Sequence, residues 1–272
     1  MKKFLNGLIA VFLLISFYCL FPHSAYAAQY SSKNGKYIVD VKSDFSIDAK
    51  KAYYQVKDEA GEFISKFETD LSPIALIPLN NGERIIGFYG GVGQTVVITQ
   101  LRFYSMRGEL IGKHGIFATG SGGQDIADEG KYFAYSWRND KKSGIDLFDT
   151  RTGKKIWGKS FKKMVNGVKL SGDGQSLLTM FGRGKIKEIH LLNNEGNLKW
   201  LGKIKTRNNC SIAYINDEGS VFEIVQSKMV YNEKDGYMHN EMVKRVIYAN
   251  DDGEVKIEKT ILPPKKSVGK SH

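Results

Sequence analysis

A short turn element recurs five times along the chain at a nearly constant spacing. Each copy joins an acidic or amide residue to glycine, and successive glycines lie 44 to 48 residues apart. The copies are Asn34-Gly35, Asn81-Gly82, Glu129-Gly130, Asp173-Gly174 and Glu218-Gly219. Each precedes a short apolar run, such as Tyr132-Phe133-Ala134. A fixed period of this length predicts repeated supersecondary units, so it constrains the fold more than composition does.

A second glycine turn is expected inside every unit, between segments that alternate apolar and polar residues. These turns are marked by Gly61, Gly108, Gly153, Gly196 and Gly253. The clearest alternation surrounds Gly153, with Ile145-Asp146-Leu147-Phe148 before it and Lys155-Ile156-Trp157 after it. A period of two is typical of half-buried strands, and tight hairpins use glycine because it readily adopts positive φ. Each unit is therefore predicted to contain four strands.

The predicted strands are joined by a short turn, a variable loop and a second short turn. In the fourth unit they cover residues 167–170, 176–181, 186–192 and 197–202. The five units are expected near residues 30–70, 71–115, 116–162, 163–205 and 206–262. Four strands in roughly 40 to 50 residues are the signature of a β-propeller blade.

Two segments resemble a known repeat family. Residues 149–157 (DTRTGKKIW) resemble the outer-strand motif of quinoprotein-like (PQQ-like) propeller repeats, and residues 193–200 (NNEGNLKW) are a weaker copy. The Asp-Gly turns resemble the start of the second strand in WD40 repeats. The pattern spans about residues 30–260 and is clearest in the third and fourth units. The resemblance implies an all-β propeller of about five four-stranded blades, and no particular activity.

The resemblance also implies a role for two tryptophans. The outer-strand tryptophan of such repeats packs between neighbouring blades, which implies a structural inter-blade role for Trp157 and Trp200. The quinone-binding enzymes that share the motif use adjacent cysteines and calcium ligands, and neither can be placed in this sequence. We therefore expect no cofactor and no metal.

The sequence leaves two possibilities for how the first and last units close the ring. The first unit has only residues 28–33 ahead of its second strand, and Pro263 and Pro264 end the last unit. Either residues 29–31 serve as the missing inner strand, or a C-terminal segment pairs with the first unit. A twin β-sandwich is the alternative architecture.

The N-terminus has the pattern of a signal peptide. Lys2 and Lys3 precede an apolar run at residues 8–21, and Ala25-Tyr26-Ala27 supplies the small residues of a cleavage site after Ala27. An uncleaved anchor is the alternative, although the run is shorter than the roughly 20 residues that span a bilayer. We expect a bacterial protein exported to the periplasm, the cell surface or the medium, with no transmembrane segment after cleavage. Residues 263–272 are expected to form a disordered basic tail.

The variable loops and inter-unit connections are expected on one face of the fold, opposite the short glycine turns. The basic or glycine-rich loops are residues 89–94, 119–124, 138–143, 182–185 and 206–209, and the longest insertion covers about 228–241. Variable loops on a rigid scaffold are where binding residues concentrate. The candidate binding residues are Arg138, Lys142, Arg183, Lys185, Arg207, Trp137 and Tyr89.

The formal net charge of +11 favours acidic partners, because a basic protein attracts anionic polymers and acidic proteins at long range. We expect a protein or an anionic cell-envelope polymer as the partner, and no nucleic acid. A solvated basic surface with no ligand is the alternative. Our first hypothesis is therefore a non-catalytic binding or assembly module.

Catalytic motifs are sparse in this sequence. Its histidines show no paired metal-ligand spacing, and it contains no G-x-S-x-G nucleophile motif. A propeller-type glycan-active hydrolase is the alternative function, since that chemistry needs only two facing carboxylates. The candidates for that role are Asp40, Asp125, Asp128 and Glu223.

Overall fold

The computed structural model describes residues 26–43, 51–92, 96–182, 185–205, 210–232, 237–249 and 255–262. The apolar run of the expected signal peptide and the expected tail at 263–272 lie outside these residues. The first strand begins at Tyr26, so cleavage after Ala27 would fall inside it. The leader and the tail therefore stay predictions.

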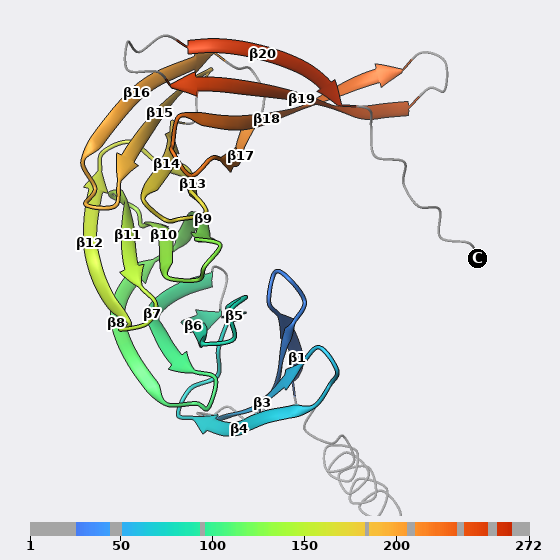
Figure 1. Ribbon diagram of the computed structural model, residues 1–272, viewed down its shortest axis with the longest axis vertical. Helices are drawn as coiled ribbons and strands as arrows, with labels where there is room; N and C mark the ends of the chain where they lie inside the picture. Colours follow the sequence, from blue (N-terminus) through green and yellow to red (C-terminus); the bar gives the residue numbers. More distant parts are fainter. Residues whose placement is uncertain are drawn as a thin grey trace, which may run out of the picture. The chain divides into compact units, whose positions relative to one another are not determined.

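Every element in the described residues is a β-strand (Figure 1). The strands form five four-stranded antiparallel sheets, each built from four consecutive strands. The first two sheets contain β1 (Tyr26–Ser31), β2 (Tyr37–Ser43), β3 (Ala52–Asp58) and β4 (Phe63–Thr69), then β5 (Ala75–Pro78), β6 (Arg84–Val92), β7 (Val96–Ser105) and β8 (Leu110–Ala118). The third contains β9 (Gly120–Ile126), β10 (Tyr132–Arg138), β11 (Ser143–Asp149) and β12 (Lys154–Phe161). The last two contain β13 (Val165–Leu170), β14 (Ser176–Phe181), β15 (Ile186–Asn193) and β16 (Leu198–Lys205), then β17 (Cys210–Ile215), β18 (Val221–Asn232), β19 (Tyr237–Ala249) and β20 (Val255–Leu262).

The predicted all-β architecture of five four-stranded units is confirmed. In the fourth unit the observed strands β13 to β16 match the predicted segments with small shifts at their ends. Residues 29–31 belong to β1, which pairs with β2, so the first of the two alternatives for the missing strand is correct. In the described part of the chain, no sheet combines strands from the two chain ends.

The Asx-Gly turn of the fourth sheet is held by local hydrogen bonds. In the fourth sheet, Oδ1 of Asp173 accepts from the Gln175 amide at 2.9 Å and from Oγ of Ser171 at 2.6 Å. Gly174 follows with φ of +72°, a region that side chains disfavour. A Cβ on Gly174 would also lie 2.2 Å from the Tyr132 ring in the preceding sheet. The turn glycine is thus required by backbone conformation and by packing.

The chain divides into two compact units, described separately here. The first comprises Met1–Tyr89 and Tyr104–Leu110, and the second comprises Gly90–Phe103 and Ile111–His272. The core of the first unit includes alternate residues of β2 and β3, among them Val39, Val41 and Val56. Alternation places these side chains on one face of the sheet, as a period of two requires.

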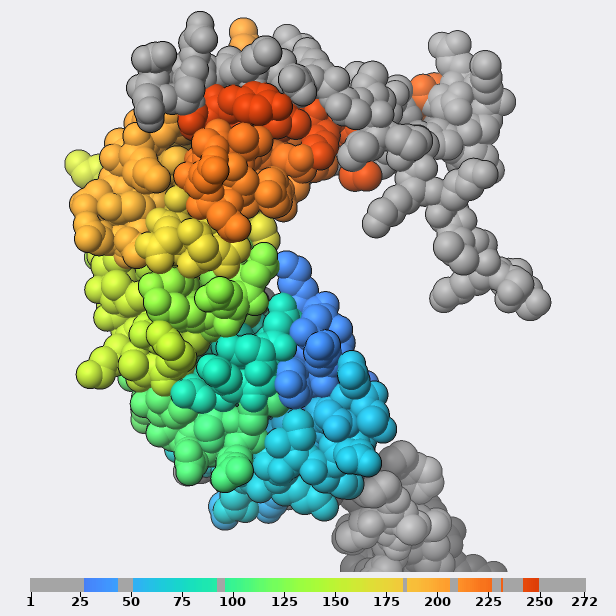
Figure 2. Space-filling model, viewed as in Figure 1, coloured from blue at the N-terminus to red at the C-terminus, as the bar shows by residue number. Residues whose placement is uncertain are grey.

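In the second unit, the third, fourth and fifth sheets follow one another in chain order (Figure 2). Their inner strands β9, β13 and β17 contact one another in turn. Buried apolar residues of β10, β11, β13 and β14 fill the space between the third and fourth sheets. No helix long and apolar enough to cross a membrane occurs in the described residues.

Two glycine-rich segments expected to be loops are wholly or partly strand. Residues 120–124 lie in β9, and residues 89–92 lie in β6. A Cβ on Gly122 would lie 2.3 Å from the Val165 carbonyl oxygen, and one on Gly90 would lie 1.9 Å from the Val97 carbonyl oxygen. Gly90 therefore allows close backbone approach within the second sheet, and Gly122 allows it between the third and fourth sheets, which is a usual meaning of glycine in a strand.

The expected insertion at 228–241 is also mostly strand. β18 and β19 continue their pairing out to Asn232 and Tyr237. Among the described residues, β17 pairs with β18 as far as Gln226, and β20 pairs with β19 as far as Met242. In that part of the chain, the outer end of this hairpin is a two-stranded ribbon.

Candidate binding site

The connection between β10 and β11 is shaped by one asparagine. The Asn139 amide donates to the Lys142 carbonyl oxygen at 2.9 Å, and Asn139 Oδ1 accepts from the amides of Lys141 and Lys142, each at 3.1 Å. Asparagine commonly organises turns in this way. The turn presents Lys141 and Lys142 as exposed side chains.

A small basic cavity lies against this turn. It has a volume of about 170 Å³ and is lined by Arg138, Asn139, Asp140, Lys141, Lys142, Ser143, Lys162 and Met164. Four of these side chains are cations and one is a carboxylate. Gly120 makes room for the Arg138 guanidinium, since a Cβ there would lie 2.3 Å from Arg138 Nε. The cavity therefore suits an anionic group.

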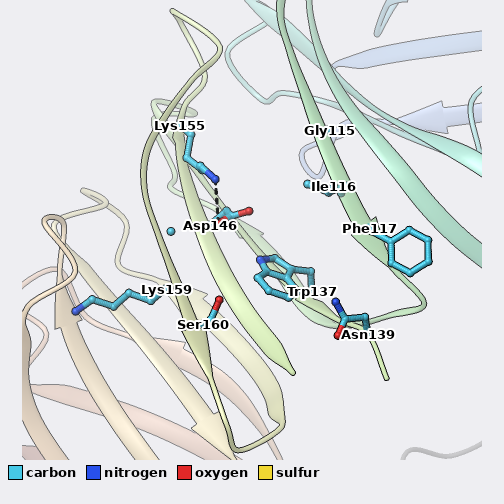
Figure 3. Close-up of a pocket in the computed structure, with 10 residues that line it drawn as sticks. Gly115, Ile116, Phe117, Trp137, Asn139, Asp146, Lys155, Lys159 and Ser160 are labelled. Atoms are coloured by element: carbon cyan, nitrogen blue, oxygen red, sulfur yellow. Dashed lines mark ion pairs between the residues drawn. The ribbon is translucent and has the colours of Figure 1, made fainter. Parts of the chain in front are cut away.

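A larger cavity of about 300 Å³ lies between β8 and the third sheet (Figure 3). Its lining residues are Gly115, Ile116, Phe117, Trp137, Asn139, Asp146, Lys155, Gly158, Lys159 and Ser160. Asn139 lines both cavities, so the two adjoin at the end of β10.

The register of the third sheet explains how this cavity is built. Trp137 lies opposite Gly144, and Asp146 lies opposite Gly158, so these residues share one face of the sheet. A Cβ on Gly144 would lie 2.3 Å from the Trp137 ring, and one on Gly158 would lie 2.3 Å from Asp146 Oδ1. The two glycines therefore leave the space that the indole and the carboxylate occupy.

Asp146 is the buried charge of this cavity. It is 5% exposed, and its Oδ1 lies 3.6 Å from Nζ of Lys155 (Figure 3). Burial raises the pKa of Asp146, while Lys155 and the Trp137 indole oppose that rise. The ammonium of Lys142 lies 6.0 Å from the centre of the Trp137 ring, within the range of a cation–π contact.

The structure brings together three of the predicted binding residues: Trp137, Arg138 and Lys142. Lys185 is exposed in the connection between β14 and β15, on the next sheet. Arg183 and Arg207 lie outside the described residues.

The placement of Tyr89 on a binding loop is corrected by the structure. Tyr89 is 1% exposed, and its hydroxyl lies 3.0 Å from that of Tyr54 and 3.1 Å from that of Tyr104. Burial raises the pKa of Tyr89 far above its usual range. Strand β6 continues past Tyr89, so the residue lies in the core of the first unit and not on a loop.

Sequence reasoning missed Asp146, Lys141 and Lys162 as members of the site. Lys141 and Lys162 lie in basic stretches where one lysine is indistinguishable from the next. Asp146 carried a signal, because it is a charged residue inside the apolar strand Ile145–Phe148. A charge at such a position requires a partner, and Lys155 supplies it.

The carboxylates considered for hydrolysis make structural contacts. Asp40 accepts from Nζ of Lys57 at 2.6 Å and from Gln29 at 2.8 Å, which lowers its pKa. Asp125 accepts from Nζ of Lys169 at 2.9 Å and from the Leu170 amide at 2.8 Å.

The remaining two candidates have different surroundings. Glu223 forms an ion pair with Lys244. The backbone amide of Asp128 donates to the Gly172 carbonyl oxygen at 2.9 Å. Within the described ranges, no group of three or more His, Cys, Asp or Glu side chains is arranged to hold a metal ion.

Trp157 and Trp200 lie between successive sheets of the second unit. Nε1 of Trp157 donates to the Asn194 carbonyl oxygen of the fourth sheet at 2.8 Å. The Trp200 ring meets the Phe222 ring of the fifth sheet edge-on, with centroids 5.3 Å apart. Each tryptophan thus extends from the outer strand of one sheet to the next sheet along the chain.

No protein-family model matches the chain, and no curated protein does. Solved structures match it. The propeller domain of the trilobed protease from Pyrococcus furiosus has a TM-score of 0.53 at 12% identity, over 85% of this chain and 70% of that one. A chain of the mitotic checkpoint complex has a TM-score of 0.52 at 14% identity, over 90% of this chain and 67% of that one.

The propeller domain of Cps50 (Swd1) from Myceliophteria thermophila has a TM-score of 0.51 at 10% identity, over 90% of this chain and 73% of that one. The chain has a β-propeller fold. It spans 65% of the Kuenenia stuttgartiensis hydrazine synthase chain and 57% of the Dos1 propeller chain that it also matches. Each sheet is accordingly a blade, and both cavities belong to the third blade, the larger one being completed by β8 of the second.

Proposed function

We propose that this protein is an exported, non-catalytic propeller that binds an acidic partner through the loop between β10 and β11. The observation that carries the proposal is the basic cavity, where Arg138, Lys141, Lys142 and Lys162 surround a space of about 170 Å³. Variable loops on a rigid scaffold are the usual place for such sites.

A non-catalytic role is supported by the state of the candidate carboxylates. Asp40, Asp125 and Glu223 are each ion-paired to a lysine of a neighbouring strand or sheet. A general acid needs a raised pKa, whereas the pKa of Asp40 is lowered. These contacts favour structural roles over proton transfer.

Export is supported by the sequence of the leader, and it would bring the basic cavity to acidic partners. The apolar run at 8–21 and the small residues at Ala25 and Ala27 have the pattern of a cleaved signal. Outside the cytoplasmic membrane, the cavity would meet carboxylate- or phosphate-bearing envelope polymers and acidic proteins. Either would be drawn by the same cations.

The test compares two double variants of equal charge. Lys141→Gln/Lys142→Gln removes two cations from the site, and Lys199→Gln/Lys203→Gln removes two exposed cations from the outer strand β16. Retention of the purified proteins is measured on immobilised polygalacturonate and poly-L-glutamate. We expect the site variant to elute at lower salt than the β16 variant. Equal elution of both variants would mean that net charge alone causes retention, and the proposal would fail.

A further inference from the structure

The cavity between β8 and the third blade has a chemistry different from that of the basic cavity beside it. Its walls supply one indole ring, one carboxylate, one amide, one hydroxyl and one ammonium group, from Trp137, Asp146, Asn139, Ser160 and Lys155. A volume of about 300 Å³ is at the lower end of small-molecule sites.

The charges of the wall disfavour a simple ion as the occupant. Asp146 is 5% exposed and faces the cavity, so an anion placed beside it would meet a poorly solvated carboxylate. Lys155, whose ammonium lies 3.6 Å from Oδ1 of Asp146, opposes a cation in the same way. Donors and acceptors set around an aromatic ring instead suit a neutral, polyhydroxylated ring. Such a ring places its C–H face on the indole and its hydroxyl groups on the carboxylate, amide and ammonium groups.

Trp137 connects this cavity to the basic one. Its ring lies over Gly144 and lines the larger cavity, while the Lys142 ammonium lies 6.0 Å from the ring centre. Lys142 also lines the basic cavity, whereas Arg138, the next residue after Trp137 in β10, points to the other face of the sheet. A ligand with a ring at Trp137 would therefore bring an attached acidic group to Lys142.

We infer that the two cavities together bind an acidic saccharide, with a sugar ring between Trp137 and Asp146 and its anionic substituent at the loop lysines Lys141 and Lys142. This inference rests on the proposed function and names the class of its partner: an anionic glycan rather than an acidic protein segment. Asp146 is the acceptor for ring hydroxyls, and Gly158 keeps the space that its carboxylate needs.

The test measures binding of two acidic oligosaccharides, oligogalacturonate and a hyaluronan hexasaccharide, and of an oligoglutamate peptide of similar charge. Titration calorimetry is run on the wild-type protein, on the Trp137→Ala, Trp137→Phe and Lys141→Gln/Lys142→Gln variants, and on the Lys199→Gln/Lys203→Gln control. Thermal unfolding checks that each variant is folded. Trp137→Phe keeps an aromatic face, so it separates loss of stacking from loss of local packing.

We expect at least one acidic oligosaccharide to bind the wild-type protein more tightly than the peptide does. Trp137→Ala should weaken binding of that saccharide by about tenfold, equivalent to about 1.4 kcal/mol, while Trp137→Phe retains most of the affinity. The lysine double variant should bind both the saccharide and the peptide more weakly than the wild-type protein does.

The outcomes separate the two proposals. If the lysine variant loses affinity but Trp137→Ala leaves saccharide binding unchanged, the basic site stands and the saccharide inference is overturned. Failure of both oligosaccharides to bind also overturns it. If the lysine variant binds every probe as the Lys199→Gln/Lys203→Gln control does, the proposed function itself fails.

Discussion

A half-exposed lysine neutralises a buried aspartate in the third blade: Nζ of Lys155 lies 3.6 Å from Oδ1 of Asp146, which is 5% exposed. Removing the lysine leaves a poorly solvated carboxylate without its cation, which destabilises the fold. We expect Lys155→Met to lower the free energy of unfolding by about 1 kcal/mol, since the lysine is partly screened by water. Urea denaturation measures this. Lys154→Met, one residue away and exposed, is the control and should have no such effect.

The raised pKa of Asp146 predicts a pH dependence of stability. A carboxyl with a higher pKa in the folded state than in the unfolded state binds protons more readily when folded, so its contribution to stability increases as pH falls through the raised value. Asp146→Asn removes this titration. The stability of the wild-type protein relative to Asp146→Asn should therefore increase from neutral pH towards the ordinary range of an aspartate. A difference that stays constant across this window would contradict the raised pKa.

Glu188 in the fourth blade should behave in the opposite way. Hydrogen bonds from Lys163 and then His190 lower the pKa of Glu188, so its stabilising contribution is present above the ordinary glutamate pKa. That contribution is lost as pH falls through the lowered value. Glu188→Gln should cost about 0.5 to 1 kcal/mol at neutral pH, because Lys163 is largely exposed, and nothing in strong acid. Parallel urea titrations at several pH values measure both limits.

Trp157 and Trp200 occupy corresponding outer strands but differ in one hydrogen bond. Nε1 of Trp157 donates to the Asn194 carbonyl oxygen, whereas Nε1 of Trp200 is buried with no hydrogen-bond partner among the described residues. Phenylalanine removes this N–H group and keeps most of the apolar packing. Trp157→Phe should therefore be more destabilising than Trp200→Phe by roughly 1 kcal/mol. Equal losses in thermal or urea denaturation would show that the two N–H groups are equivalent.

Two of the turn glycines allow the energetic cost of backbone strain to be compared with that of steric contact. Gly35 and Gly174 have φ of +74° and +72°, but a Cβ meets nothing within 4 Å at Gly35 and lies 2.2 Å from the Tyr132 ring at Gly174. Gly35→Ala should cost about 1 kcal/mol for the left-handed conformation. Gly174→Ala should cost more than that, because Tyr132 must also move. If thermal unfolding gives the same loss for both, inter-blade packing at this turn is looser than the structure indicates.

The fold was largely readable from the sequence because its turns are local. An Asx side chain followed by a positive-φ glycine determines a hairpin within a few residues, as Asp173 and Gly174 do. The glycines at 90 and 122 were assigned to loops because their function is non-local. Each glycine accommodates a carbonyl oxygen of another strand, and the residues next to it in the sequence give no sign of that contact.

The candidate site was only partly readable for the same reason. Arg138 and Lys142 lie next to a loop whose composition indicates exposure, so sequence found them. The larger cavity depends on cross-strand register, which places Gly144 beside Trp137 and Gly158 beside Asp146. Register of this kind is set by pairing across the whole sheet and cannot be read from one strand alone.

The construction of every blade from one uninterrupted stretch of chain has a consequence for how the protein forms. Hydrogen bonds within a blade join only segments that are close in sequence, so each blade can complete its pairing before the next is available. Assembly can then advance from the first blade towards the last, which suits the export that we propose, in which the N-terminus would cross the membrane first.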